Sequence, residues 1–153
     1  MDKNHTCCIT GHRDIPTEII PYLQNQLHQE LLQAIHMGYT HFISGFASGV
    51  DLIFAEIVVD LKSEYPITLE SAIPYAGRMN TPNKTFQFLL KECDIVKVHT
   101  EKHSKNCYMV RNRYMVDCSK LVIAVHDGRK RGGTAATIRY AHQTKRIVWE
   151  IKL

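Results

Sequence analysis

Hydrophobic positions along the chain form two kinds of segment that alternate from end to end. Short apolar runs of strand length lie at residues 6–10, 40–44, 67–73, 94–98, 121–125 and 146–151. Longer segments at residues 17–37, 50–62, 81–92, 105–118 and 134–143 carry apolar residues at near-helical spacing. This alternation predicts one three-layer α/β domain over residues 1–153, with a mostly parallel sheet and helices on both faces.

The order of the strands decides where a ligand would bind. We expect the order 3-2-1-4-5, numbered along the chain, with the last strand at an edge. In parallel sheets of this kind, ligands bind beyond the carboxyl ends of the strands, at the point where the order reverses. The runs at residues 6–10 and 94–98 would form that switch point. The loops that follow strands are therefore the first candidates for chemistry.

The composition is that of an ordinary globular protein. Hydrophobic residues make up 44% and charged residues 22% of the chain, and 19 basic against 15 acidic residues leave a net charge of +4. No apolar run reaches the roughly 18 residues of a membrane span, and the first residues lack the apolar core of a signal peptide. We expect a cytoplasmic protein with no membrane partner.

The cysteine and histidine residues do not predict a metal site. The five cysteines include no CxxC pair, and the nine histidines include no HExxH motif. We expect the cysteines to be buried thiols, and we predict no metal and no definite cofactor.

The first candidate loop is "TGHRD", residues 10–14. Gly11 allows a tight turn and lets a ligand approach the backbone. Arg13 can hold a phosphate through its fork of N–H donors, and His12 can stack or hydrogen-bond. The alternative interpretation is a turn with an exposed arginine.

The second candidate loop is "ISGFASGVD", residues 43–51, which leads from a strand into a helix. The loop has small residues at three alternate positions, Gly45, Ala47 and Gly49. They indicate either a tight turn or the close approach of a large group to the backbone. Helix N-termini attract anions, and Ser44 would add a hydroxyl donor. Asp51, in the first helical turn, would favour the helix dipole or accept a hydrogen bond from a ribose hydroxyl. The loop has neither the GxGxxG nor the GxxxxGK[ST] pattern.

The third candidate loop is "HDGRKRGGTAAT", in which Gly132, Gly133 and Thr134 precede a helix. The basic run at residues 129–131 lies where an anion would arrive. This placement favours a phosphate site over a solvated loop.

A neighbouring helix, expected at residues 105–118, would close the cleft. We expect Arg111 or Asn112 to reach into it from that helix. Three apolar residues of the helix are interpreted as core: Met109, Val110 and Met115.

Five pieces of the chain, in this order, resemble the SLOG superfamily: "ITGHR", "FISGFASGVDLIFAE", "RNRYMVD", "LVIAVHDG" and "GGTAATIRYA". That superfamily includes DprA and the LOG cytokinin-activating enzymes, and the chain is most similar to the YpsA-like branch. The resemblance implies a Rossmann-like fold that binds nucleotides or nucleotide-derived ligands. Carried over by position, it implies ligand contacts at Gly11, His12, Arg13, Ser44, Gly45, Ala47, Gly49, Asp51, Gly132, Gly133 and Thr134.

One departure from the LOG pattern bears on enzymatic activity. LOG enzymes carry PGGxGTxxE, whose glutamate helps to cleave an N-glycosidic bond, but Thr137 stands at that position here and the proline is absent. We therefore expect no LOG-type activity. A hydrolase of this kind would need another carboxylate, for which Asp51, Asp14 and Asp127 are candidates.

Three functions remain open. The first is a binding or sensor domain for a nucleotide-like ligand, with phosphate held by helix N-termini and Arg13; the resemblance implies a role in bacterial stress or cell division. The alternative is an N-glycosidic hydrolase of nucleoside monophosphates or NAD-like molecules. The third is a module that binds single-stranded nucleic acid, against which the mild charge and the core-like spacing of the aromatic residues argue. The oligomeric state is open, although a helix face shared between identical subunits is common for this fold.

Overall fold

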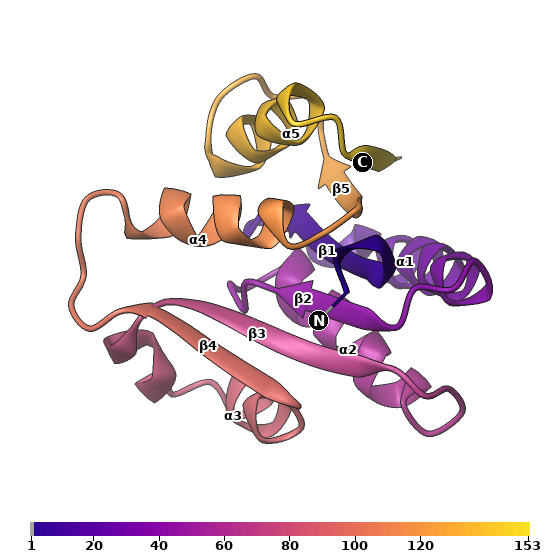
Figure 1. Cartoon of the computed structure of the whole chain (residues 1–153), viewed down its shortest axis with the longest axis horizontal. Coiled ribbons are helices and arrows are strands. Elements are labelled where there is room, and N and C mark those ends of the chain that lie inside the picture. Colours follow the sequence, from indigo (N-terminus) through magenta and orange to yellow (C-terminus); the bar gives the residue numbers. More distant parts are fainter. Residues whose placement is uncertain (1) are drawn as a thin grey trace.

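Strands and helices alternate throughout the part of the chain that the computed structural model describes, residues 2–153 (Figure 1). The strands are β1 (Thr6–Gly11), β2 (His41–Ser44), β3 (Thr68–Tyr75), β4 (Ile95–Thr100), β5 (Leu121–His126) and β6 (Ile147–Lys152). The α-helices are α1 (Ile20–His36), α2 (Val50–Leu61), α3 (Lys84–Lys91), α4 (Cys107–Asp117) and α5 (Gly133–Gln143). Short 3₁₀ turns are η1 (Lys3–His5), η2 (Thr17–Ile19) and η3 (Ala76–Asn80). The predicted α/β fold is confirmed.

The six strands form one parallel sheet in the order β4-β3-β2-β1-β5-β6. The expected order was wrong, because β4 lies at an edge and β5 occupies the place beside β1. Cys8 of β1 is paired with Ile43 of β2 on one side and with Val122 of β5 on the other. Burial explains the difference: the first five residues of β5 are buried, which suits a central strand, whereas β4 exposes Val96 and Lys97.

The helices cover both faces of the sheet. On one face α2 lies over β1, β2 and β3 and packs between α1 and α3. On the other face α4 lies over β3 and β4, and α5 lies beside it over β5, β6 and β1 (Figure 1). Because the chain moves outward from β1 to β4 and then returns along α4 to β5, the strand order reverses between β1 and β5. That boundary is the switch point.

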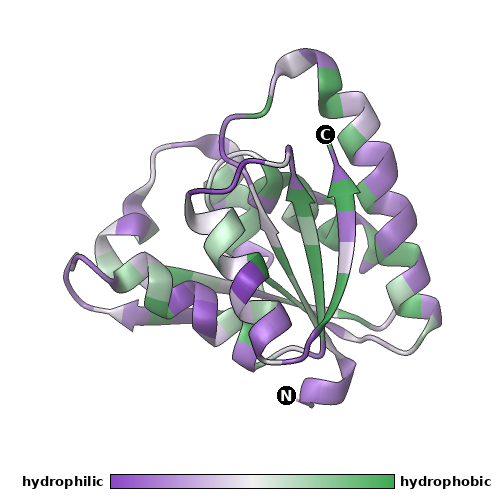
Figure 2. Ribbon diagram, turned by 90° about the horizontal axis from the view of Figure 1, so that it is seen from above, coloured by the Kyte–Doolittle hydropathy of each residue, from purple (hydrophilic) through white to green (hydrophobic). Residues whose placement is uncertain are grey.

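The core lies between the sheet and its helices. Figure 2 shows the central strands coloured as hydrophobic over most of their length. The periodicity of the first helix is confirmed, since Leu23, Leu27 and Leu31 of α1 are fully buried. No helix among the described residues is long and apolar enough to cross a membrane.

Two expectations about buried residues need correction. Met115 lies in the core, but Met109 and Val110 are each 45% exposed, because this side of α4 faces away from the sheet. All five cysteines are free thiols, but not all are buried as expected. Cys7, Cys8 and Cys107 are buried, whereas Cys93 and Cys118 are only half-buried.

Candidate functional site

A cavity of about 390 Å³ opens at the carboxyl ends of β1 and β5, at the switch point of the sheet. Four parts of the chain line it. They are the end of β1 and its loop (Ile9, Thr10, Gly11, His12, Arg13, Asp14), the segment from the loop after β2 into α2 (Ala47, Asp51), α4 (Tyr108, Arg111, Asn112) and the segment from the loop after β5 into α5 (Arg129, Arg131, Gly132, Gly133, Thr134). The cavity therefore combines segments that are far apart in the sequence.

Most of the residues that the sequence singled out meet at this cavity. Those that line it are Gly11, His12, Arg13, Ala47, Asp51, Arg111, Gly132, Gly133 and Thr134. Ser44, Gly45 and Gly49 do not line it. The hydroxyl of Ser44 instead donates to the backbone carbonyl of Asp51 at 2.9 Å and accepts from the N–H of Phe46 at 3.2 Å.

The glycines of "ISGFASGVD" serve the packing of the protein itself. A Cβ atom at Gly45 would lie 2.8 Å from Nη1 of Arg111 and 2.9 Å from Oδ2 of Asp51. Gly49 has a φ of +81°, and a Cβ there would lie 2.6 Å from the carbonyl oxygens of both His12 and Arg13. The small residues therefore let α4 and the loop after β1 approach the loop after β2.

An ion-pair network joins the loops that follow β1 and β5. Arg129 donates to the carboxylate of Asp127 at 2.6 Å and to that of Asp14 at 3.4 Å. The hydrogen bonds from Arg129 hold the pKa of Asp127 well below its usual range. The N–H of Asp127 in turn donates to Nε2 of His12 at 3.3 Å, and burial lowers the pKa of His12. These contacts favour a neutral His12 and keep both exposed carboxylates ionised.

Arg111 fixes the inner wall of the cavity. It is 4% exposed, and its Nη1 donates to the carbonyl oxygens of Gly45 at 2.6 Å and Ala72 at 3.0 Å. Its Nε donates to Oδ1 of Asn112 at 2.8 Å, whereas its Nη2 donates to no residue of the described chain. One guanidinium nitrogen of a buried arginine is therefore left for a ligand.

Tyr108 also lines the cavity, although no sequence motif pointed to it. The guanidinium carbon of Arg13 lies 5.1 Å from the centre of its ring and that of Arg111 lies 5.6 Å from it, at distances typical of cation–π contacts. Tyr75 and His103 meet the same ring edge to face. Because Tyr108 is the second residue of α4, the only signal for it was its place at the start of a helix after a strand.

Asp51 is the buried carboxylate of the cavity. It is 8% exposed, and within the described chain only its Oδ2 has a partner, the N–H of Ala47 at 3.2 Å. Burial raises the pKa of Asp51 to about 6, although the charges of Arg111 and Arg13 act in the opposite direction. Of the three carboxylates considered as acid–base candidates, Asp51 alone is free of the Arg129 network.

The N-terminus of α5 presents unpaired backbone donors to the cavity. Gly132 precedes the helix with a φ of +100°, and a Cβ there would meet nothing within 4 Å. The N–H groups of Gly133, Thr134 and Ala135 donate no hydrogen bond within residues 2–153. Thr134 is 8% exposed, and its hydroxyl also lacks a partner in that range. This arrangement suits an anion.

The α2 N-terminus is less available to a ligand than that of α5. The N–H of Val50 donates to the carbonyl oxygen of His12 at 3.2 Å, and the N–H of Ala47 is taken by Asp51. Of the two helix N-termini that the sequence suggested, the structure leaves the one at Gly133 more open. Among the described residues, no three His, Cys, Asp or Glu side chains come together as metal ligands.

The chain folds into three layers, a parallel sheet between two layers of helices, with a polar cavity at the switch point of the sheet. This architecture defines a Rossmann-like domain. The sequence model described as the YspA SLOG family (YpsA) matches residues 5–152. The chain belongs to this family.

Comparison with individual proteins gives the same picture. A UPF0398 protein from Staphylococcus haemolyticus is 26% identical over 141 residues, which cover 83% of this chain and 75% of that protein. The structure of DNA processing protein A (DprA) from Streptococcus pneumoniae superposes on 99% of this chain with a TM-score of 0.73 and 16% identity. DprA from Helicobacter pylori superposes on the same share with a TM-score of 0.72 and 19% identity. This chain covers 51% of the first DprA chain and 67% of the second, and these similarities show a shared fold.

Proposed function

We propose that the cavity binds a nucleotide or a nucleotide-derived molecule, with its phosphate at the N-terminus of α5. One observation carries the proposal: three polar side chains that are at least nine-tenths buried turn unpaired atoms toward one cavity. They are Oδ1 of Asp51, Nη2 of Arg111 and Oγ1 of Thr134. Each of these residues is more than nine-tenths buried, yet none of the three atoms is itself a buried atom without a partner, since among the described residues those are Oγ of Ser71 and Nε2 of His99. The three atoms therefore stay accessible at the cavity, where a polar ligand can bond them.

The charges around the cavity favour an anionic group on that ligand. The arginines that line it are Arg13, Arg111, Arg129 and Arg131, whereas its acidic residues are Asp14 and Asp51. Because Arg129 is committed to two carboxylates, Arg13 and Arg131 are the exposed arginines left to reach a phosphate. Their side chains would supplement the open N–H groups of α5.

A role as a ligand sensor in bacterial stress or cell division, as the resemblance to YpsA-like proteins implies, would follow from binding alone. Under this proposal the cavity recognises its ligand without transforming it. The position of Thr137 agrees with this interpretation, since its hydroxyl donates to the carbonyl oxygen of Gly133 at 2.8 Å. It is thus bonded within its own helix.

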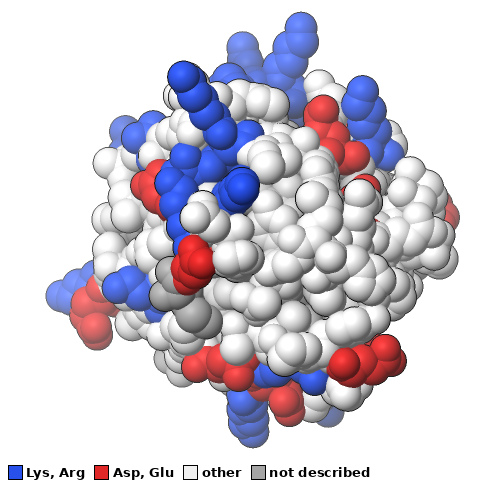
Figure 3. All heavy atoms as spheres, turned by 45° about the vertical axis from the view of Figure 1, so that its right-hand side comes forward, with Lys and Arg blue, Asp and Glu red and all other residues white. Residues whose placement is uncertain are grey.

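Single-stranded nucleic acid is a second candidate ligand. The H. pylori DprA structure is described for its single-stranded DNA binding mode. In this chain the rings of Tyr75, His103 and Tyr108 form a cluster, of which Tyr108 lines the cavity; the core-like spacing of aromatic residues did not predict this cluster. Aromatic rings beside arginines suit stacked bases. However, the net charge of the chain is only +4, which is small for a nucleic-acid-binding surface. On the one face that Figure 3 shows, basic and acidic side chains lie around the rim and uncharged residues occupy the centre.

Hydrolysis of an N-glycosidic bond is a third candidate function, favoured by the burial and raised pKa of Asp51. Incubation with nucleoside monophosphates and NAD, followed by chromatography for free base, tests it directly. Release of base that disappears in Asp51→Asn would replace the binding proposal by an enzymatic one.

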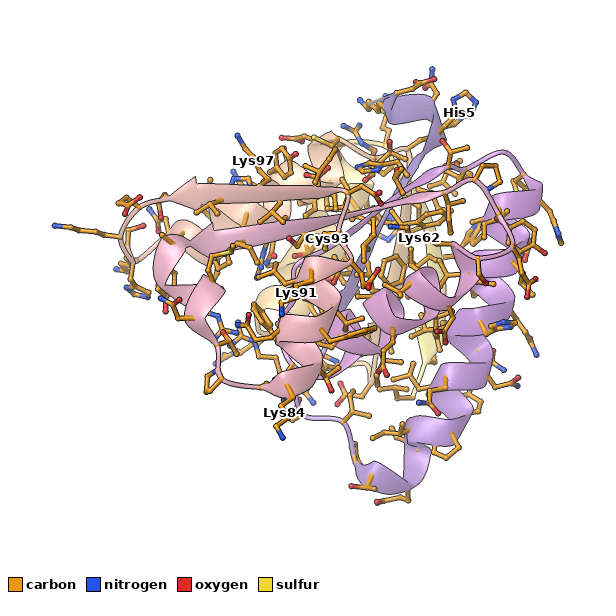
Figure 4. All side chains as sticks on the ribbon, turned by 90° about the horizontal axis from the view of Figure 1, so that it is seen from below. His5, Lys62, Lys84, Lys91, Cys93 and Lys97 are labelled. Atoms are coloured by element: carbon orange, nitrogen blue, oxygen red, sulfur yellow. The ribbon has the colours of Figure 1, made fainter. Side chains whose placement is uncertain are left out.

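A nucleotide panel in a thermal-shift assay tests the proposed binding function. At a ligand concentration of about 100 times the Kd, we expect Tm to rise by several degrees. We expect Arg13→Ala to weaken binding by about 10- to 100-fold, since it removes a charged donor. Lys84→Ala is the matched control, because Lys84 is exposed on α3, where Figure 4 shows it pointing away from the ribbon.

The same assay separates the candidate ligands. No Tm shift with any nucleotide, together with unchanged behaviour of Arg13→Ala, would refute the proposal. Tighter binding of a short single-stranded oligonucleotide than of its mononucleotides, with a steep loss in salt, would favour the nucleic-acid alternative.

A further inference from the structure

We infer that the groove between α4 and α5 is the base-binding part of this site, so that the ligand is a nucleoside phosphate rather than a sugar phosphate. This inference rests on the proposed phosphate site at the N-terminus of α5. The groove has a volume of about 260 Å³ and lies outside the cavity described above. Tyr108, Asn112 and Gly133 line both spaces, which are therefore contiguous.

The walls of the groove suit the flat faces of an aromatic base. Met109 is 45% exposed although it is apolar, and it lines the groove opposite Ala136 and Tyr140 of α5. The ring of Tyr140 is held in place, because its hydroxyl donates to Asp117 at 2.7 Å and the guanidinium of Arg113 lies 4.8 Å from the ring centre. A base could stack in this space against preorganised aromatic and guanidinium surfaces.

Polar groups at the groove suit the edge of a base. Gln143, at the C-terminal end of α5, lines the groove, and no other residue of the described chain bonds its side-chain amide. At the other end Asn112 accepts from Nε of Arg111 through Oδ1, which leaves its amide nitrogen free to donate. These two amides provide both donors and acceptors, as the edges of nucleobases require.

The junction between the two spaces leaves room for a ligand to pass. Gly133 has no side chain, and a Cβ atom there would come no closer to any atom than 3.8 Å, at Nδ2 of Asn112. A phosphate at the N–H groups of the first turn of α5 would therefore place the rest of a nucleotide beside Asn112. From there it can extend toward Met109 and Tyr140.

Binding measurements with and without a base test this inference. Isothermal titration would compare the adenosine, guanosine, cytidine and uridine 5′-monophosphates with ribose 5-phosphate. We expect the best nucleotide to bind at least tenfold more tightly than ribose 5-phosphate. Equal affinities would overturn the inference while leaving the phosphate site intact, whereas no binding by any of these compounds would refute both.

Two pairs of variants locate the base. Ala136 is exposed and lines the groove, so the tryptophan side chain of Ala136→Trp would fill it. We expect this variant to weaken nucleotide binding at least tenfold and to change ribose 5-phosphate binding less than twofold. The control is His142→Trp, at a position that is also exposed on α5 but lies outside the groove. Met109→Ala should weaken nucleotide binding three- to tenfold, and Val110→Ala, equally exposed but outside the groove, should not.

The same variants would show whether the groove is instead a contact between two copies of this chain. If Ala136→Trp and Met109→Ala leave nucleotide affinity unchanged but alter the mass measured by light scattering, the groove is a contact between copies of this chain. That result would overturn the base-binding assignment.

Discussion

Nη1 of Arg111, in α4, donates to the carbonyl oxygen of Gly45, directly after β2, at a distance of 2.6 Å. The same nitrogen donates to Ala72 of β3 at 3.0 Å. A single buried guanidinium thus joins α4 to β3 and to the loop after β2, and at the same time forms the inner wall of the cavity. The stability of this region and the shape of the site therefore depend on the same residue.

The first prediction concerns Arg111→Lys. An ammonium group cannot reproduce the fork that bonds Gly45, Ala72 and Asn112, so buried acceptors lose their donors. We expect the free energy of unfolding to fall by about 2–4 kcal/mol in urea denaturation. Arg131→Lys, at an exposed position, should change it by less than about 0.5 kcal/mol. Equal stabilities of the two variants would contradict the structural role of Arg111.

The second prediction contrasts two glycines at the starts of helices. Gly49→Ala forces a Cβ to within 2.6 Å of two carbonyl oxygens at a φ of +81°, and we expect it to destabilise the protein by about 2–4 kcal/mol. Gly133→Ala meets no atom closer than 3.8 Å and lies in a helix, so it should leave stability unchanged or raise it by up to about 1 kcal/mol.

The same pair of variants distinguishes packing from binding. The methyl group of Gly133→Ala would stand beside the open N–H groups of α5, so we expect weaker binding of nucleotides and of ribose 5-phosphate in a stable protein. Calorimetric titration on Gly133→Ala checks this, and full retention of affinity would place the phosphate elsewhere.

The third prediction follows from the titration of Asp51. Its pKa is raised to about 6 from an ordinary value of 3.8, so the folded protein binds the proton more tightly than the unfolded chain does. The stability that Asp51 contributes is therefore present below about pH 4 and is lost as the pH rises through 6, a change of about 2–3 kcal/mol.

Asp51→Asn should remove this component. Urea denaturation at pH 4 and at pH 7.5 would measure it as the difference between the wild-type protein and the variant, in which titrations common to both cancel. We expect the variant to gain stability relative to the wild-type protein as the pH rises. Parallel pH profiles would show that Asp51 has an ordinary pKa.

The fourth prediction concerns Glu70, a buried carboxylate of β3 that lies outside the cavity. Burial by itself would raise its pKa, but hydrogen bonds from His41 and Tyr114 outweigh that effect and lower it. The stability contributed by Glu70 is therefore present above its ordinary pKa of 4.5 and is lost as the pH falls through the lowered value.

Tyr114→Phe removes one donor to this carboxylate without changing the shape of the side chain. We expect a loss of about 1–3 kcal/mol at pH 7 and a smaller further loss on acidification than in the wild-type protein. Urea denaturation between pH 3 and pH 7 measures both. Tyr22→Phe, at a half-exposed position, is the matched control and should behave as the wild-type protein does.

The hydrophobic pattern predicted the elements because burial on one face imposes a local period. Leu23, Leu27 and Leu31 are buried along α1 at the spacing that identified the helix. The exact first residue of a helix depends on its cap and not on this period. The helix expected from residue 81 begins at Lys84, because Asn83 caps it by accepting from the N–H of Phe86 at 3.0 Å.

The candidate site was predictable in its loops but not in its contacts. Loops after parallel strands meet at one edge of a sheet, which is why Gly11, Asp51 and Gly133 could be grouped from the sequence. The contact between the ring of Tyr108 and Arg13 joins segments that are distant in the sequence, and no local pattern encodes it. No motif indicated the ion pair of Arg129 with Asp127 either.

The sequence by itself determined the alternation of strands and helices, the family and the loops that carry the chemistry. It could do so because hydrophobic periodicity and short motifs are local properties of the sequence. Only the tertiary structure decided that β5 rather than β4 lies beside β1. It also decided that Gly45 and Gly49 make room for the protein itself and that the open helix N-terminus is at Gly133. These features depend on which distant segments pack together, and packing is a property of the whole fold.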